Sequence, residues 1–226
     1  MTETNPAYAG RVKYTEDRSR KYQKRKPTKH SAEMRLLEKA FALIPKDHRV
    51  LDAPCGGGRV TLHLAQLGFR ISSADLSDAM IKITRENVER AGLKTTVEKQ
   101  DVERFSYPDR EFDTVVSFRL FHHFPNADIR RRVVRELCRI ADKFVVLSYF
   151  SPASFTSIRN RLVEKLTGKQ SKKYSTSLSE VEGYFGEAGF RLVQDFAQTP
   201  LIHTLHVAVF ARGEKKHEGC GCGHQH

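Results

Sequence analysis

Two aspartates stand at the ends of predicted strands, and three consecutive glycines lie between them. Asp52 ends an apolar segment, the glycines occupy positions 56–58, and Asp75 follows 17 residues after Gly58. Glycine has no Cβ, so a bulky ligand can approach the main chain, and amides at the start of the next helix can face a polar group. An acid about 20 residues after such glycines is typical of ribose recognition, because a carboxylate accepts hydrogen bonds from both hydroxyls. The pattern predicts a nucleotide-like cofactor.

These residues need a strand, a turn and a helix to position them. Residues 50–52 suit a buried strand, an amphipathic helix pattern begins at residue 59 and stops at Gly68, and a second strand spans 69–75. A strand, a glycine turn and a helix open a βαβ unit. Any doubly wound domain can use glycines in its first turn, so the glycines alone leave the function open.

The segment from Asp52 to Gly58 resembles motif I of the class I S-adenosylmethionine-dependent methyltransferases, in which glycines at alternate positions follow an acid. Pro54 replaces the first glycine, so we expect a different local turn path. The chain is similar to the ubiquinone/menaquinone-type, small-molecule subgroup. The resemblance implies the cofactor S-adenosyl-L-methionine and a Rossmann-like α/β fold. That fold is a three-layer αβα sandwich with a seven-stranded, mostly parallel sheet.

The resemblance also implies roles for individual residues. We expect the methionine portion of the cofactor beside Asp52 and the glycines, the ribose at Asp75, and the adenine at Asp101 and Val102. In the alternative interpretation, Asp101 only caps a turn. The expected cofactor-binding set is Asp52, Ala53, Pro54, Gly56, Gly58, Asp75, Leu76, Asp101, Val102 and Phe118.

Two adjacent histidines, His122 and His123, follow the fourth predicted strand at 112–118. Ligands of parallel sheets bind at the carboxyl ends of the strands, so these side chains are candidates for catalytic residues. Imidazole titrates near neutrality, and either ring can be the general base that removes the acceptor's proton. The alternative is that neither is catalytic, because methyl transfer depends mostly on alignment of acceptor, methyl and sulfur.

Positive charge is concentrated near the N-terminus. The chain has 39 Lys and Arg against 27 Asp and Glu, a formal charge of +12, and nine basic and two acidic residues between positions 11 and 30 supply +7 of it. Tyr14, Tyr22 and Arg25 lie there. A basic arm with interleaved aromatics can bind nucleic acid. A solvated tail and a lid over the site are the alternatives.

We expect one domain with added ends. Residues 1–30 form the basic arm or lid, 31–212 the methyltransferase domain, and 213–226 a flexible Cys/His tail. Ser31 is the expected N-cap of a first helix that runs to about Ile44. Residues 151–176 are expected to form a substrate cover. After a predicted helix that stops near Gly168, a second basic patch is expected at Lys169, Lys172, Lys173 and Tyr174. An earlier helix, from about Asp128, carries arginines expected to face largely outward, at Arg130, Arg131, Arg132, Arg135 and Arg139.

The cysteines do not form the pattern of a disulfide framework. Cys55, Cys138, Cys220 and Cys222 are divided between the glycine turn, a helix and the tail. We expect free thiols. The tail either binds a soft metal ion or is disordered, and no metal is assigned to the site. The absence of a long apolar stretch and of a signal peptide predicts a cytoplasmic protein without a membrane span.

The predicted function is transfer of a methyl group to oxygen of a small or lipid-linked acceptor, an acidic one included. The oligomeric state is left open. Residues 117–120 read Ser-Phe-Arg-Leu where amino-methylating DNA and RNA enzymes carry Asn/Asp-Pro-Pro-aromatic, so nucleic acid is not favoured as the substrate. The alternatives are an RNA methyltransferase, a cofactor-binding module without transfer, and a metal-handling protein that acts through its tail.

Overall fold

A computed structural model describes residues 27–152, 173–197 and 204–213. The expected arm up to residue 26, residues 153–172 of the substrate cover and the tail from residue 214 lie outside the described residues. The elements are α3 (Pro27–Phe41), β1 (Arg49–Asp52), α4 (Arg59–Gln66), β2 (Arg70–Asp75), α5 (Asp78–Arg90), β3 (Val97–Lys99), β4 (Phe112–Ser117), η1 (Phe121–His123), α6 (Ala127–Ile140), β5 (Ala141–Phe150), α8 (Leu178–Glu187), β6 (Phe190–Ala197) and β7 (Leu205–Arg212).

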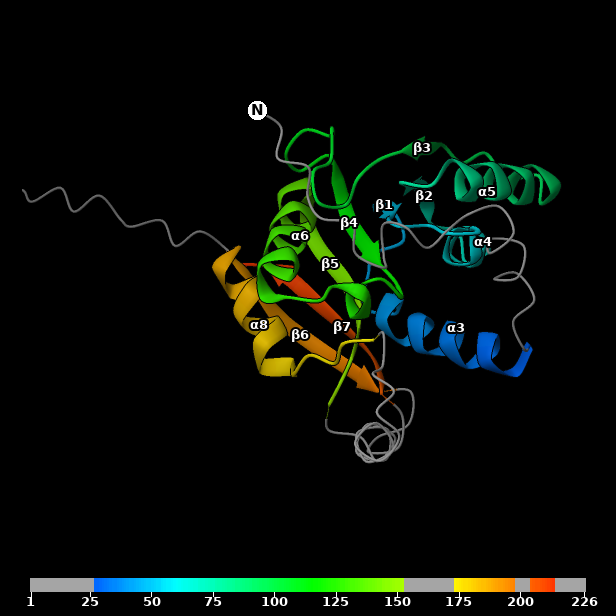
Figure 1. Ribbon diagram of the computed structural model, residues 1–226. Coiled ribbons are helices and arrows are strands. Elements are labelled where there is room, and N and C mark those ends of the chain that lie inside the picture. The colour runs from blue at the N-terminus through cyan, green and yellow to red at the C-terminus, as the bar shows by residue number, and fades with distance from the viewer. Residues whose placement is uncertain (1–26, 153–172, 198–203, 214–226) are drawn as a thin grey trace, which may run out of the picture.

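The sheet has seven strands in the order β3-β2-β1-β4-β5-β7-β6. Strands β1 to β5 pair in parallel, and β7 is antiparallel to both of its neighbours, which confirms the predicted mostly parallel sheet (Figure 1). Asp52 pairs with Ser73 of β2 and with Val116 of β4, so these three strands end at one edge. The strand order reverses between β1 and β4, where sheets of this type bind ligands.

Helices cover both faces of the sheet, as expected for a three-layer sandwich. Figure 1 shows α6 and α8 on one side and α3 and α4 on the other. Successive residues of a strand point to opposite faces, and both faces are buried here. Val115 and Val145 pack in the cluster with α6 and α8, whereas Val116 and Val146 pack in the cluster with α3 and α4. The continuous apolar character of the central strands follows from this double cover.

Helix caps confirm several predicted element boundaries. The Ser77 hydroxyl accepts a hydrogen bond from Met80 N at the start of α5, and the Ser177 hydroxyl accepts one from Glu180 N at the start of α8. Asn126 caps α6 in the same way. Each side chain satisfies an amide that the first turn leaves without a helical partner.

The start of the first helix was predicted wrongly. Helix α3 begins at Pro27, so Ser31 lies within it and is not its N-cap. Proline suits a first helical turn, because its missing N–H would have no helical partner there and its φ is already helical. In the described part of the chain, no helix has the length and apolar character needed to cross a membrane.

The predicted outward orientation is wrong for Arg130, which is buried between α6, α8 and the segment after η1. Its Nη1 donates to a Glu180 carboxylate oxygen at 2.9 Å, and its Nη2 donates to the Phe124 carbonyl at 3.2 Å. The side chain is 9% exposed. Arg130 therefore joins the helical layer to the segment that carries the histidines.

We predict that Glu180→Ala lowers the free energy of unfolding by about 1–2 kcal/mol, because it leaves the buried Arg130 charge poorly compensated. Glu180 is partly exposed, which keeps the cost below that of a fully buried pair. Urea denaturation measures the effect. The control is Glu182→Ala on the same helix, exposed to solvent and expected to change stability by less than about 0.5 kcal/mol. Equal losses for both variants would contradict the role of the ion pair.

Candidate active site

The turn between β1 and α4 requires glycine at two positions. Gly56 and Gly58 have φ values of +54° and +80°, in the left-handed region that disfavours other residues. A Cβ on Gly58 would lie 3.0 Å from Cγ2 of Thr84, whereas a Cβ on Gly56 would have no atom of the described residues within 4 Å. The main chain is thus packed tightly against α5 at Gly58 and is open at Gly56. The Ala53–Pro54 peptide bond before the turn is cis.

Helix α5 holds this turn through two side chains that the sequence analysis did not assign to the site. The Thr84 hydroxyl donates to the Gly56 carbonyl at 2.6 Å, and Asn87 Nδ2 donates to the Gly57 carbonyl at 3.0 Å. These carbonyls would otherwise lack helical or strand partners, so the bonds fix the turn. The available signal was a threonine and an asparagine three residues apart on one face of a predicted helix.

Asp75 lies against the same turn from the end of β2. Its Oδ2 accepts a hydrogen bond from Gly56 N and its Oδ1 accepts one from Ser77 N, both at 2.9 Å. Burial raises the pKa of this carboxyl, while the hydrogen bonds from Ser77 and Gly56 act in the opposite direction. Each carboxylate oxygen has a second lone pair. Asp75 can therefore hold the turn and still accept hydrogen bonds from a ligand.

Asp52 is fully buried at the end of β1. Its Oδ2 accepts a hydrogen bond from the Thr61 hydroxyl at 2.8 Å, and that hydroxyl lies 2.8 Å from the hydroxyl of Ser73. In the described part of the chain, Oδ1 of Asp52 has no hydrogen-bond partner. Burial raises the pKa of Asp52 to about 7, with a smaller contribution from the Asp75 charge. A buried acceptor without a partner is costly, and a donor supplied by a ligand would satisfy it.

The remaining predicted cofactor residues occupy different environments. Ala53 is buried and donates its amide to the Val116 carbonyl at 2.9 Å, whereas Leu76 is 37% exposed beyond the end of β2. Phe118 is buried in the core cluster with α3. Asp101 Oδ1 accepts a hydrogen bond from Glu103 N at 3.0 Å, so it caps a local turn, and Val102 packs against the core.

Both histidines lie in η1, directly after β4. His122 and His123 are buried, and their ring centroids are 4.2 Å apart. The His122 ring also stacks on Phe150 of β5, with centroids 4.1 Å apart and planes 14° apart. The two imidazoles are therefore at the carboxyl ends of the central strands, as predicted.

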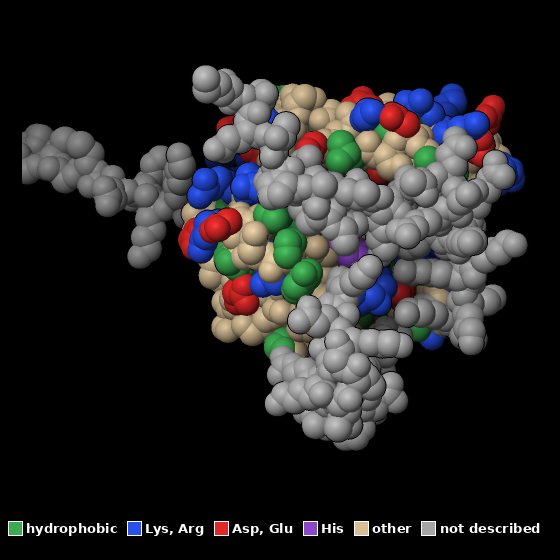
Figure 2. All heavy atoms as spheres, viewed as in Figure 1, with side chains coloured by type: hydrophobic (Ala, Val, Ile, Leu, Met, Phe, Trp, Pro, Cys, Tyr) green, Lys and Arg blue, Asp and Glu red, His purple; other side chains and the backbone are tan. Residues whose placement is uncertain are grey.

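Ion pairs offset much of the positive charge on α6. Arg131 pairs with Glu187 and Arg139 pairs with Glu136. Arg132 pairs with the buried Glu103. On the face viewed in Figure 2, acidic and basic side chains are interspersed over α5 at the upper right. The described residues of α6 therefore do not form an open anion-binding surface.

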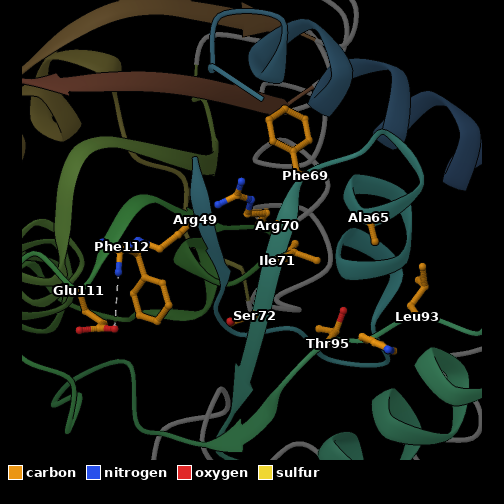
Figure 3. Close-up of a pocket in the computed structure, with 11 residues that line it drawn as sticks. Arg49, Ala65, Phe69, Arg70, Ile71, Ser72, Leu93, Thr95, Glu111 and Phe112 are labelled. Carbon is orange, nitrogen blue, oxygen red and sulfur yellow. Dashed lines mark ion pairs between the residues drawn. The ribbon is translucent and has the colours of Figure 1, made fainter. Parts of the chain in front are cut away.

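A pocket of about 460 Å³ lies away from this site. It is lined by residues at the amino ends of β1, β2 and β4, among them Arg49, Arg70 and Glu111. Figure 3 shows the ion pair between Arg49 and Glu111 beside Phe112. Because Asp52 and Asp75 are at the opposite ends of these strands, this pocket is separate from the glycine turn.

The described residues contain no group of three or more His, Cys, Asp or Glu side chains that could hold a metal ion. The cysteines of the tail lie outside them. Cys55 and Cys138 are buried free thiols, as expected, and burial raises the pKa of both. Neither is suited to act as a thiolate nucleophile near neutral pH.

We predict that Asp52 makes stability depend on pH. Its folded pKa of about 7 exceeds that of an unfolded aspartate, so its contribution to the free energy of unfolding is full at acid pH and declines as the pH rises through 7. Between about pH 5 and about pH 8 the decline should be about 2–3 kcal/mol. Asp52→Asn should remove this pH-dependent decline, which urea denaturation at several pH values measures. The control variant Asp78→Asn, which changes an exposed carboxyl, should show the same decline as the wild type. An unchanged slope in Asp52→Asn would refute the assignment.

Comparison with known proteins finds a methyltransferase domain in this chain. Residues 50–143 match the family model described as "Methyltransferase domain". The chain is 28% identical over 147 residues to the magnesium protoporphyrin IX methyltransferase of Arabidopsis thaliana chloroplasts, covering 63% of this chain and 46% of that protein. It is 26% identical over 165 residues to the ubiquinone biosynthesis O-methyltransferase of Xanthomonas axonopodis pv. citri, covering 70% and 69%. The chain thus matches about half the length of the plant relative.

The fold is also shared with solved structures. Magnesium protoporphyrin IX methyltransferase from Synechocystis PCC 6803, solved with S-adenosylhomocysteine, superposes with a TM-score of 0.68 at 20% identity, covering 82% of each chain. The PH0226 protein from Pyrococcus horikoshii superposes with a TM-score of 0.69 at 18% identity, covering 85% of this chain and 98% of that one. Together with the glycine turn and the strand order, the match of residues 50–143 to a methyltransferase domain supports a class I S-adenosylmethionine-dependent methyltransferase.

Proposed function

We propose that this protein transfers the methyl group of S-adenosylmethionine to oxygen of a small or lipid-linked acceptor and releases S-adenosylhomocysteine. The observation that carries the proposal is the convergence of Asp52, the Gly56 turn and Asp75 at the edge where the strand order reverses. The match to a methyltransferase domain and the names of two relatives, a magnesium protoporphyrin IX methyltransferase and a ubiquinone biosynthesis O-methyltransferase, support it.

The donor's chemistry fits the groups at this edge. The amino acid portion carries an ammonium, which can donate to the buried Oδ1 of Asp52. The open main chain at Gly56 leaves space for a ligand beside the turn. Asp75, adjacent to Gly56, is suited to accept hydrogen bonds from the ribose hydroxyls.

The adenine is assigned to Asp101 and Val102, which follow the edge strand β3 beside β2. Asp101 already caps a turn, and its carboxylate has further acceptor capacity toward an exocyclic amine. Ala53, Pro54, Leu76 and Phe118 complete the proposed set. Of these, Phe118 contributes through packing, because its side chain is buried in the core cluster that also contains residues of α3.

The bound donor supplies an activated methyl group on a sulfonium. The protein's contribution is to exclude water and to align the acceptor with that methyl group. His122 and His123 are the groups proposed to accept the acceptor's proton. Their place after β4 and their burial support this role. If the acceptor ionises in solution, neither ring is needed as a base, and the histidines act as walls of the site.

The RNA alternative receives less support. Arg131, Arg132 and Arg139 of α6 form ion pairs with Glu and Asp side chains in the described structure. The basic arm on which RNA binding would depend lies outside the described residues. We therefore place the acceptor among small or lipid-linked molecules.

The cofactor assignment predicts that Asp75→Asn weakens binding of S-adenosylmethionine by about 10- to 100-fold, because an amide has one acceptor oxygen where the carboxylate has two. Isothermal titration calorimetry measures the affinity, and circular dichroism confirms the fold. Asp78→Asn, three residues away and exposed, is the control and should bind as wild type does. The absence of wild-type binding at millimolar ligand would overturn the proposed function.

Transfer itself is tested with cell extract and donor carrying a labelled methyl group. Label should appear in a small-molecule or lipid fraction, which separates an enzyme from a binding module. Gly58→Ala should abolish labelling, because its backbone is left-handed and the added Cβ would contact Thr84. Gly57→Ala is the matched control, since its Cβ would meet Ile83 Cγ2 at an ordinary 3.6 Å. Label recovered in RNA would favour the alternative.

A further inference from the structure

The pocket at the amino ends of β1, β2 and β4 carries a row of three basic residues. Arg49 of β1 pairs with Arg70 of β2 in the parallel register. Lys94 lies three residues before Val97 of β3, just as Arg70 lies three residues before Ser73, the β2 partner of Val97. All three basic side chains line the pocket. The register therefore places three cations in a row along this edge of the sheet.

Two of these three cations have no acidic partner among the described residues. The Arg49 charge is offset by Asp113, whose Oδ2 lies 3.3 Å from Arg49 Nε, and by Glu111, whose Oε1 lies 3.9 Å from Arg49 Nη1. By contrast, neither Arg70 nor Lys94 forms an ion pair or a side-chain hydrogen bond with any described residue, and both are exposed. Like charges at directly opposite strand positions repel each other. A bound anion would offset this repulsion.

Apolar side chains form the rest of the pocket's lining. Phe69, Ile71 and Phe112 belong to the protein core, with exposed fractions of 5%, 7% and 7%, and they also line the pocket. Figure 3 shows Phe112 on one side of the space and Leu93 on the other. The volume of about 460 Å³ is in the range of small-molecule sites. Such sites combine an apolar lining with a few polar groups, as this pocket does.

We propose that this pocket is a second ligand site, which binds a small organic anion with a carboxylate or phosphate group on an apolar body. Arg70 and Lys94 pair with the anionic group. A guanidinium presents paired donors that match both anions, and it keeps its charge at any physiological pH. The hydroxyls of Ser72 and Thr95, which also line the pocket, can donate further hydrogen bonds. The apolar body lies against the core side chains of the lining.

This ligand does not compete with the methyl donor. Arg49 and Asp52 are the first and last residues of β1, and Arg70 and Asp75 are the first and last residues of β2. The pocket and the glycine turn are therefore at opposite edges of the same strands, and both ligands can be bound together. The inference does not depend on methyl transfer.

The test uses isotope-labelled full-length protein and four probes: 2-naphthoate, 2-naphthyl phosphate, the neutral 2-naphthalenemethanol, and acetate, which lacks an apolar body. Protein-observed NMR titration gives both the affinity and the place of binding. The two naphthyl anions should shift the backbone amides of residues 70–72 and 93–95. They should bind at least about fivefold more tightly than the alcohol or acetate. The shifts should persist in excess S-adenosylhomocysteine.

Three variants test the basic residues. Arg70→Gln and Lys94→Gln should each weaken binding of both naphthyl anions at least about threefold and leave the affinity for the alcohol unchanged, because only the charge is removed. Both positions are exposed, so the fold should tolerate the changes. Arg191→Gln is the matched control, since Arg191 is also an exposed strand arginine, on β6 at the far edge of the sheet. This variant should bind all four probes as the wild type does.

Several results would overturn the inference. Equal affinities for the naphthyl anions and the alcohol would show that the cations of the pocket are only solvated charges. Shifts confined to the glycine turn would place the anion at the other edge of the sheet. Unchanged affinities in both Arg70→Gln and Lys94→Gln, or an equal loss in Arg191→Gln, would also contradict it. Failure of S-adenosylhomocysteine to bind would count against the proposed function alone, because the pocket is titrated without it as well.

Discussion

The hydrogen bond between Gly56 N and the Asp75 carboxylate is the constraint on which the site depends. It joins the turn after β1 to the end of β2, while Thr84 and Asn87 hold the turn's carbonyls from α5. The backbone at Gly56 is left-handed, so the turn needs partners for its polar groups as well as glycine itself. Three elements therefore position a short stretch of main chain that has space beside it for a ligand.

Burial gives the two carboxylates properties that an exposed pair would not have. Asp52 and Asp75 are both removed from water, and burial raises the pKa of each. Their charges are tolerated because hydroxyls and amides donate to them, through Thr61 for Asp52 and through Gly56 and Ser77 for Asp75. A cationic or hydroxyl-bearing ligand would supply the further donors that these oxygens can accept. The same two buried carboxylates therefore affect both the free energy of unfolding and the binding of a ligand at the carboxyl ends of β1 and β2.

Sequence reasoning predicted the elements well where local chemistry decides them. The caps at Ser77 and Ser177 and the antiparallel final strands are confirmed, and the fourth strand, predicted at 112–118, is observed at Phe112–Ser117. It was wrong about Ser31, because a proline four residues earlier can begin the helix, and about Arg130, which has a partner on α8. It did not assign Thr84 and Asn87 to the site, since their role depends on how α5 packs against the turn.

By itself, the sequence determined the family resemblance, the glycine turn and the acids at the strand ends, because these follow from residue types at short spacing along one segment. Only the tertiary structure decided which distant side chains meet. Glu33 lies between Arg59 and Arg119, and His122 stacks on Phe150, although these pairs are separated by 26 or more residues. The burial that makes a charge or an acceptor costly arises when helices from both layers close over the sheet.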